Sequence, residues 1–256
     1  MTPPRTLSLL PRAPRSGARR RPLLCLPYAG GGSRSYDSWQ HLLPQAVDAQ
    51  TLRLPGRESR AADPVPGDLR ALAGEIADEL GPHLNGPFAL FGHSMGAILA
   101  YELAQHLRAR FGLSPHCLFV SGSRPPDRLV TGRQYSRMDD GTLRAALEAM
   151  GGTDPEVLAD PELWHLVEPV IRADLIMSDH YTHRQAEPLS CPVVAYGSKE
   201  DVDLDGESLE AWRARTTGPF TSRVFPGDHF YFRRWPEGLV MDLSNRLYEH
   251  MIEVDG

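Results

Sequence analysis

The stretch Phe88-Ala-Leu-Phe-Gly-His-Ser-Met-Gly-Ala-Ile-Leu-Ala-Tyr101 decides the predicted fold. Its apolar beginning predicts a buried strand, and its second half, with apolar residues at helical spacing, predicts a helix. Ser94 lies between them in a Gly-x-Ser-x-Gly motif, flanked by Gly92 and Gly96. A strand that turns straight into a helix packs these two positions together, so a Cβ there would clash. We therefore predict a sharp turn that presents Ser94 as a nucleophile, and not a chance match in a loop.

The composition fits one α/β domain with a single core. The chain has 256 residues, 41% of them hydrophobic, and a formal net charge of −6, which does not favour nucleic-acid binding. Three cysteines, Cys25, Cys117 and Cys191, lie in or beside predicted strands. We expect buried, reduced thiols in a reducing, cytoplasmic compartment. Every apolar run is shorter than the roughly 18 residues of a membrane span, so we expect no membrane partner.

The first 21 residues differ from the rest of the chain. They contain six arginines and four prolines and have little hydrophobic periodicity. We predict a disordered basic tail over residues 1–21, followed by a single domain over residues 22–256. The apolar run after the arginines is too short for an export signal, which needs roughly 7–15 apolar residues.

The order of predicted elements indicates a sheet with helices on both sides. Strand patterns alternate with helical patterns along most of the chain, which implies a mostly parallel sheet with right-handed crossovers. A helix over residues 236–252 closes the chain. The six strands are expected at residues 22–26, 50–54, 88–91, 117–120, 192–196 and 220–225.

The alternation breaks at residues 129–189, where helical patterns occur without a convincing strand. A helical insertion in an α/β chain is typical of a lid over the mouth of a site. We therefore predict a helical lid over residues 129–189. An additional packing layer that does not move is the alternative.

A glycine-rich turn, Pro27-Tyr-Ala-Gly-Gly-Gly-Ser33, follows the first strand. It lacks the lysine of a phosphate-binding P-loop and the spacing of a dinucleotide-binding fingerprint. A turn between a strand and a helix leaves backbone N–H groups free. We predict that the N–H groups of Ala29 and Met95, the residue after the nucleophile, form an oxyanion hole.

The base and the acid are expected at the ends of later strands, where functional groups of parallel sheets gather. Among ten histidines, His229 is the one that lies just after the last predicted strand. The acid should follow the preceding strand, and Asp201 lies there in a tight turn, with Glu200 as a rival. We predict a catalytic triad of Ser94, Asp201 and His229. This chain order is that of α/β-hydrolases, whose fold we therefore expect.

These residues predict acyl transfer to water. Ser94 attacks an acyl carbonyl while His229 accepts its proton, and water then hydrolyses the acyl-enzyme. His93, beside the nucleophile, is expected to pack against the turn, because a sequence neighbour points away from Ser94. We expect no cofactor and no metal, since the sequence has no ligand cluster of usable spacing.

Motifs in and outside the Ser94 turn carry a resemblance to a known family. The chain after Arg21 resembles type II thioesterases, the free-standing editing enzymes of modular polyketide and nonribosomal peptide synthases. The motifs are Leu26-Pro-Tyr-Ala-Gly-Gly31, Leu54-Pro-Gly-Arg-Glu58, Phe91-Gly-His-Ser-Met-Gly-Ala97, Arg172-Ala-Asp-Leu175 with Tyr181, and Gly227-Asp-His-Phe230. The second and fourth motifs are not general features of hydrolases, so they are the most discriminating.

The resemblance implies a substrate and a partner. It implies hydrolysis of acyl groups from the phosphopantetheine arm of acyl or peptidyl carrier proteins, by a monomer with a triad at Ser94, Asp201 and His229. One departure is Gly197-Ser-Lys-Glu-Asp201, where family members often have a second glycine, so the choice between Asp201 and Glu200 stays open.

Further alternatives are also open. A second hypothesis is an enzyme of the same fold that hydrolyses a small ester or an acyl-CoA. A third hypothesis is a binding module without turnover. Arg57 and Arg60 are either solvated loop charges or border the site. A basic patch for an acidic carrier protein is expected from Arg124, Arg128, Arg133 and Arg137.

Overall fold

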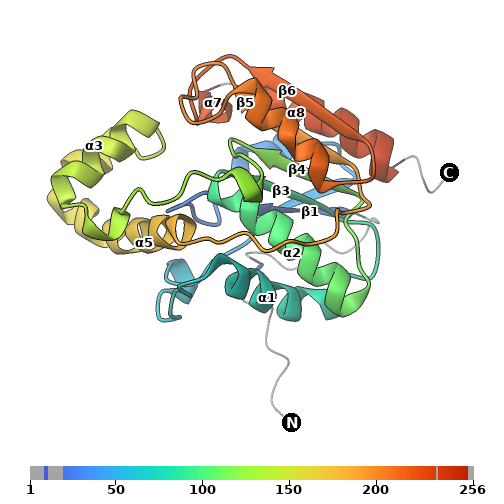
Figure 1. Ribbon diagram of the computed structural model, residues 1–256, viewed down its shortest axis with the longest axis horizontal. Coiled ribbons are helices and arrows are strands. Elements are labelled where there is room, and N and C mark those ends of the chain that lie inside the picture. The colour runs from blue at the N-terminus through green and yellow to red at the C-terminus, as the bar shows by residue number, and fades with distance from the viewer. Residues whose placement is uncertain (1–8, 11–19, 235, 253–256) are drawn as a thin grey trace, which may run out of the picture.

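The computed structural model describes residues 9–10, 20–234 and 236–252 (Figure 1). The basic tail predicted over residues 1–21 lies mostly outside the described residues. Leu9 is buried in the core of the domain, where its carbonyl accepts a hydrogen bond of 2.8 Å from the Arg53 N–H. Arg21 begins the first strand. At these two points the chain belongs to the folded domain rather than to a tail.

In the described part of the chain, six strands form one parallel sheet in the order β2-β1-β3-β4-β5-β6. This arrangement confirms the predicted α/β-hydrolase fold. The strand order reverses beside β1 and β3, and ligands of open parallel sheets bind at such a switch point. The strands are β1 (Arg21–Leu26), β2 (Val47–Thr51), β3 (Ala89–His93), β4 (Cys117–Ser121), β5 (Val193–Ser198) and β6 (Phe220–Phe225).

The second strand begins three residues earlier than the predicted range of 50–54, at Val47. As an edge strand it carries partly exposed residues, so its sequence lacks the apolar run that marks the central strands. The apolar Leu52 and Leu54 lie beyond its end and are fully buried. Hydrophobic pattern therefore located the buried residues correctly and placed the strand too late.

Helices cover both faces of the sheet, with α1 and α2 on one side and α8 on the other (Figure 1). None of the helices that the structure describes is both long and apolar enough to cross a membrane. The helices are α1 (Leu69–Leu80), α2 (Met95–Phe111), α3 (Asp140–Met150), α4 (Pro155–Ala159), α5 (Pro161–Asp179), α6 (Gly206–Glu210), α7 (Tyr231–Arg234) and α8 (Pro236–Leu247). Short 3-10 turns are η1 (Asp37–His41), η2 (Glu58–Arg60), η3 (Gly81–His83), η4 (Pro126–Arg128), η5 (Tyr135–Arg137) and η6 (Ala211–Arg215), and η7 (Tyr248–Ile252) is a π turn.

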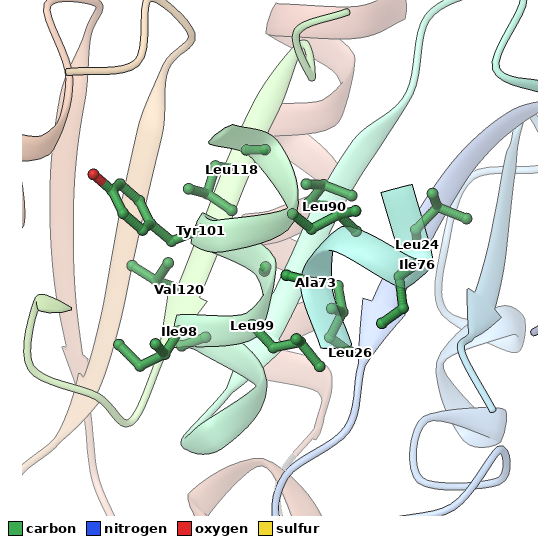
Figure 2. Packing of buried hydrophobic residues seen from close by; sticks show 14 of the residues in the cluster. Leu24, Leu26, Ala73, Ile76, Leu90, Ile98, Leu99, Tyr101, Leu118 and Val120 are labelled. Carbon is green, nitrogen blue, oxygen red and sulfur yellow. The ribbon is translucent and has the colours of Figure 1, made fainter. Parts of the chain in front are cut away.

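The core between α2 and the sheet fixes where α2 begins, and so where Ser94 lies. Figure 2 shows Ile98, Leu99 and Tyr101 of α2 packed with side chains of the central strands, among them Leu90 and Val120. The labelled residues have at most 2% of their surface exposed. All three cysteines are free and buried, as predicted, and burial raises the pKa of each thiol.

The insertion between β4 and β5 is helical, as predicted. Residues 122–192 contain α3, α4 and α5 and form no strand apart from an isolated bridge between Leu189 and Thr216. The insertion has an apolar cluster of its own, which includes Leu143, Trp164 and Ile171. Figure 1 shows α3 and α5 projecting from the sheet beyond its edge. The insertion thus has apolar packing of its own, while Met177 of α5 belongs to the core of the sheet.

Candidate active site

The backbone at Ser94 makes the sharp turn that the sequence predicts. Ser94 has φ +56° and ψ −120°, in the short link between β3 and α2. A Cβ on Gly92 would lie 2.0 Å from the Gly96 carbonyl oxygen, which confirms the predicted clash. A Cβ on Gly96 would instead meet the neighbouring strand, 2.2 Å from the Leu26 carbonyl oxygen. A side chain is therefore excluded at both positions by a close backbone approach. Gly96, however, approaches the end of β1 and not Gly92.

His229 and Asp201 are joined at the carboxyl ends of β6 and β5. His229 Nδ1 lies 2.7 Å from Asp201 Oδ2, and Asp201 Oδ1 accepts a hydrogen bond of 3.0 Å from the Asp203 N–H. The Asp201 side chain is 2% exposed and that of His229 is 14% exposed. A carboxylate only accepts hydrogen bonds, so Nδ1 carries the proton and Nε2 is left as a base.

Ser94 and His229 line the same pocket. Within the described residues the Ser94 hydroxyl makes no hydrogen bond, so the pocket brings Ser94 and His229 together without a hydrogen bond between them. Such bonds are often long in ligand-free enzymes and shorten when the substrate binds. The arrangement suits nucleophilic attack on a group held in this pocket.

The carboxylates of Asp201 and Glu200, which the sequence left as rivals, have different partners. Glu200 Oε2 accepts a hydrogen bond from the Gly227 N–H, and the Glu200 N–H donates to the Gly227 carbonyl at 3.1 Å. Glu200 therefore holds the loop that leads to His229, whereas Asp201 contacts the imidazole itself. Of the two, only Asp201 is placed to orient that ring.

Ala29 and Met95 both line the Ser94 pocket. Met95 is the first residue of α2, so its N–H has no partner within the helix. In the turn after β1, the Gly30 N–H donates to Asp174 Oδ2 and the Gly31 N–H donates to the Tyr28 carbonyl, both at 2.8 Å. No described residue accepts from the Ala29 N–H, so this donor is left without a partner within the described residues.

Two cavities meet beside His229. The one that contains Ser94 has a volume of about 140 Å³ and is lined by aliphatic residues of the sheet domain and the insertion, namely Leu69, Ile98, Leu129, Leu175 and Leu204. The other, of about 440 Å³, is bordered by the acids Glu200, Asp201, Asp203 and Asp228 and by Ala146 and Ala149 of α3. Both include Arg133, Tyr135, Met150, Asp203 and His229. Both cavities have mixed linings, since the first also includes Arg124 and Asp179 and the second Met138 and Val202, and His229 borders each of them.

His93 packs beneath the site, as expected. It is fully buried, and its Nδ1 lies 2.9 Å from Ser121 Oγ, which in turn lies 2.8 Å from the Tyr231 hydroxyl. Burial, together with the nearby His229 and Arg233, lowers its pKa well below the usual value. The His93 ring lies 4.8 Å from the His229 ring, measured between centroids. A neutral His93 therefore supports the His229 ring without competing with it for a proton.

Arg57 is not a solvated loop charge. Its guanidinium is buried, with Nη2 2.7 Å from Asp174 Oδ1 and Nη1 donating to the Gly31 carbonyl at 2.7 Å. Arg60 instead pairs with Asp63 in a surface turn. The sequence signal for the Arg57–Asp174 pair was present, because these residues lie in the two most discriminating motifs, but spacing could not show that they meet.

The arginines proposed as a docking patch are largely paired. Arg133 contacts Asp203 at 2.6 Å, and Arg124 donates to the Asp203 carbonyl at 2.8 Å. Arg128 lies 3.6 Å from Glu207. The hydrogen bond from Arg133 outweighs burial and lowers the pKa of Asp203. The acidic loop after β5 thus folds against Arg124, Arg128 and Arg133, whereas Arg137 lies at the surface, 3.5 Å from Gln134 Oε1. A docking role for these four arginines stays a prediction.

Comparison with known proteins identifies the family. The sequence model of the Thioesterase domain matches residues 21–247. The gramicidin S biosynthesis protein GrsT of Aneurinibacillus migulanus is 38% identical over 216 residues, which cover 84% of each chain. RedJ, a thioesterase of the prodiginine biosynthetic pathway in Streptomyces coelicolor, is 37% identical with a TM-score of 0.83, over 93% of this chain and 97% of its own.

The resemblance seen in the motifs is thereby confirmed. A third similar structure is BorB, the type II thioesterase of the borrelidin biosynthetic cluster, which is 32% identical with a TM-score of 0.86. The alignment covers 94% of this chain and 98% of BorB. These relatives serve antibiotic and related biosynthetic pathways of the polyketide and nonribosomal peptide kind. The chain therefore belongs to the thioesterase family, as a type II thioesterase that hydrolyses thioesters.

Proposed function

We propose that this thioesterase removes acyl groups from the phosphopantetheine arm of acyl or peptidyl carrier proteins, and so frees stalled synthases. The observation that carries the proposal is the contact of 2.7 Å between His229 and Asp201 beside a pocket that contains Ser94. The relatives support the substrate class, because the resemblance implies that their synthases carry intermediates as carrier-bound thioesters. The enzyme is proposed to act as a monomer, which sedimentation equilibrium would test.

Ser94 is the proposed nucleophile, with His229 as the base and Asp201 as the residue that orients it. His229 Nε2 takes the Ser94 proton as the hydroxyl attacks the thioester carbonyl. The Ala29 and Met95 N–H groups stabilise the oxyanion, and each such donor is worth about 3–4 kcal/mol in comparable enzymes. His229 then gives the proton from Ser94 to the departing thiolate of the arm, and the neutral ring next takes a proton from the water that hydrolyses the acyl-enzyme and returns it to Ser94.

The two compartments beside His229 suggest how the substrate lies. The acyl group is proposed to occupy the cavity that contains Ser94, because its methylenes would be buried there against aliphatic side chains such as Ile98 and Leu175. The polar arm would reach Ser94 through the larger compartment that α3 borders. The insertion over residues 129–189 would then act as a lid over both, and opening of α3 would admit the arm.

The test is release of an acyl group from a loaded carrier protein, followed by intact mass. Ser94→Ala should abolish release, whereas Ser244→Ala, on α8 at the other face of the sheet, should leave it unchanged. Release at the wild-type rate by the Ser94→Ala variant would refute the proposal.

Two alternatives are separated by the choice of substrate. A higher kcat/KM on acyl-CoA or on p-nitrophenyl esters than on acyl-carrier protein would favour a small-ester or acyl-CoA hydrolase. A fluorophosphonate probe distinguishes the third possibility, a binding module without turnover. Failure of the probe to label Ser94 would favour that module.

A further inference from the structure

The turn that carries Ala29 has the features of a type II β-turn over Tyr28 to Gly31. The Gly31 N–H donates to the Tyr28 carbonyl at 2.8 Å, and Gly30 has φ +77°, the value typical of the third position of such a turn. In a planar trans peptide, C=O and N–H point in opposite directions. The bond that the Tyr28 carbonyl makes therefore also sets the direction of the Ala29 N–H. Whatever keeps this turn closed determines where that N–H points.

Two buried side chains from distant parts of the chain hold the turn. Asp174 Oδ2 accepts from the Gly30 N–H at 2.8 Å, and Asp174 Oδ1 pairs with Arg57 at 2.7 Å. Arg57 also donates to the Gly31 carbonyl at 2.7 Å. Type I and type II turns differ by a flip of the central peptide, which here is the one with the Gly30 N–H. The carboxylate therefore selects the type II form, and the guanidinium fixes the Gly31–Gly32 peptide at the end of the turn.

The same helix also closes the turn by packing. A Cβ on Gly30 would lie 2.5 Å from Cγ1 of Ile171, one turn before Asp174 on α5. Asp174 is fully buried and Arg57 is 7% exposed, so neither charge is satisfied by bulk water. A shift of α5 away from the turn would break the pair and leave two buried charges unpaired, which is strongly unfavourable.

We propose that Arg57 and Asp174 are positioning residues for the oxyanion hole, and that α5 of the insertion is a fixed part of the active site. The inference rests on the proposed function, in which the Ala29 N–H stabilises the oxyanion. It assigns a role in the reaction to a pair that touches neither the nucleophile nor the base. It also divides the insertion, since only the segments before α5 remain free to open as a lid.

The test separates positioning from simple stabilisation by removing both charges at once. Arg57→Met/Asp174→Leu replaces the ion pair by apolar side chains of similar size, which avoids an unpaired buried charge. The matched control is Arg70→Met/Glu102→Leu, another ion pair, at 2.9 Å with Glu102 1% exposed, which does not line the Ser94 pocket. Thermal unfolding reports the structural effect of each change, and kcat and KM report the catalytic one.

We expect the Arg57→Met/Asp174→Leu variant to lose about 10- to 100-fold in kcat, a fraction of the loss on removing a whole oxyanion donor. KM should change less than about threefold, because the substrate pocket is unaltered. The fluorophosphonate should label Ser94 more slowly by a similar factor, since that reaction also develops an oxyanion. The control variant should keep its kcat even if its melting temperature falls by as much as that of the Arg57→Met/Asp174→Leu variant.

A kcat for Arg57→Met/Asp174→Leu within threefold of the control variant would overturn the proposal. If that variant does not fold, Asp174→Asn gives the same comparison, because the amide keeps the size but can accept from only one of the two donors. Failure of the wild-type enzyme to hydrolyse acyl-carrier protein would refute the proposed function instead. The labelling rate of Ser94 would then still test the positioning pair.

Discussion

The two sides of the active site are built in different ways. The Ser94 turn is shaped by backbone contacts of its own strand, helix and neighbouring strand, with a Gly92 Cβ excluded by the Gly96 carbonyl at 2.0 Å. The Ala29 turn is held by side chains that lie 26 and 144 residues further along the chain, through the bonds Arg57–Gly31 and Asp174–Gly30. The first side is a local steric solution and the second depends on tertiary contacts. The first should therefore fail in folding when it is changed, and the second in catalysis.

The largest effect is expected from Gly92→Ala. Its Cβ would collide with backbone atoms that cannot move without displacing α2, so we expect a loss of more than about 4 kcal/mol in the free energy of unfolding. Thermal or urea unfolding measures this loss. Gly67→Ala is the control, because a Cβ there meets nothing within 4 Å. Similar melting temperatures for both variants would contradict a steric origin of the turn.

The next largest effect is expected from Asp201→Asn, on kcat and not on stability. Asp201→Asn removes the acceptor that orients His229, and comparable substitutions lower kcat by about 10⁴-fold with the fold intact. Steady-state kinetics on a thioester substrate would measure it. Glu200→Gln should change kcat far less, because that carboxylate contacts the Gly227 backbone and not the imidazole. The opposite ranking of the two variants would reassign the acid of the triad.

A smaller change is expected from loosening the insertion at Arg172. Its guanidinium donates to the Tyr135 and Met138 carbonyls, at 2.9 and 2.6 Å, and so ties the start of the insertion to α5. Arg172→Met should lower stability by about 1–3 kcal/mol, because it leaves these acceptors without their donor. We also expect a higher KM for acyl-carrier protein, with little change in kcat on a small thioester.

Arg246→Met is the control for Arg172→Met. Arg246 makes longer surface ion pairs on α8, at 3.8 Å to Asp242 and 3.5 Å to Glu249, which are worth about 0–1 kcal/mol. Unfolding in urea compares the two variants. An equal effect of both on stability and on KM would argue against a special role of Arg172 in holding the insertion.

The smallest effect is expected on the pH dependence of stability, through the carboxylate of Glu58. Burial raises the pKa of this carboxyl, but hydrogen bonds from Ser33 and Arg53 outweigh it, so the folded pKa lies below the ordinary 4.5. Ionised Glu58 therefore adds stability above pH 4.5, and this part is lost as the pH falls through the folded pKa. Glu58→Gln should be less stable than wild type near neutral pH, and the two should converge in acid. A constant difference between about pH 7 and pH 3 would show that the charge of Glu58 plays no part.

The sequence predicted most of the sheet and the residues at its strand ends. Alternation of patterns placed β1, β3, β4 and β5 within a few residues, since buried central strands have continuous apolar runs. It also placed β6, the other edge strand, although most of its residues are half-buried or exposed. It misplaced β2, because the polar Asp48 and Gln50 interrupt that strand and the apolar Leu52 and Leu54 lie beyond its end. His229 and Asp201 could be chosen from strand order, because parallel strands deliver their carboxyl ends to one edge. Their contact of 2.7 Å, and the different partner of Glu200, required coordinates.

Sequence alone predicted the Ser94 turn, because the two glycines and the serine lie within five residues and the Gly96 backbone excludes a Cβ at Gly92. That Gly96 in turn must approach β1 at Leu26 was visible only in the structure. The sequence determined the fold class for a similar reason, since periodicity is a local property. Tertiary structure decided how the Ala29 turn is held, because charges as far apart in the chain as Arg57 and Asp174 pair only once α5 has packed against the sheet domain. It also decided that Arg124 and Arg133, although partly exposed, pair with the acidic loop after β5. Which partner a charged side chain finds depends on the whole fold, and its position in the sequence does not reveal it.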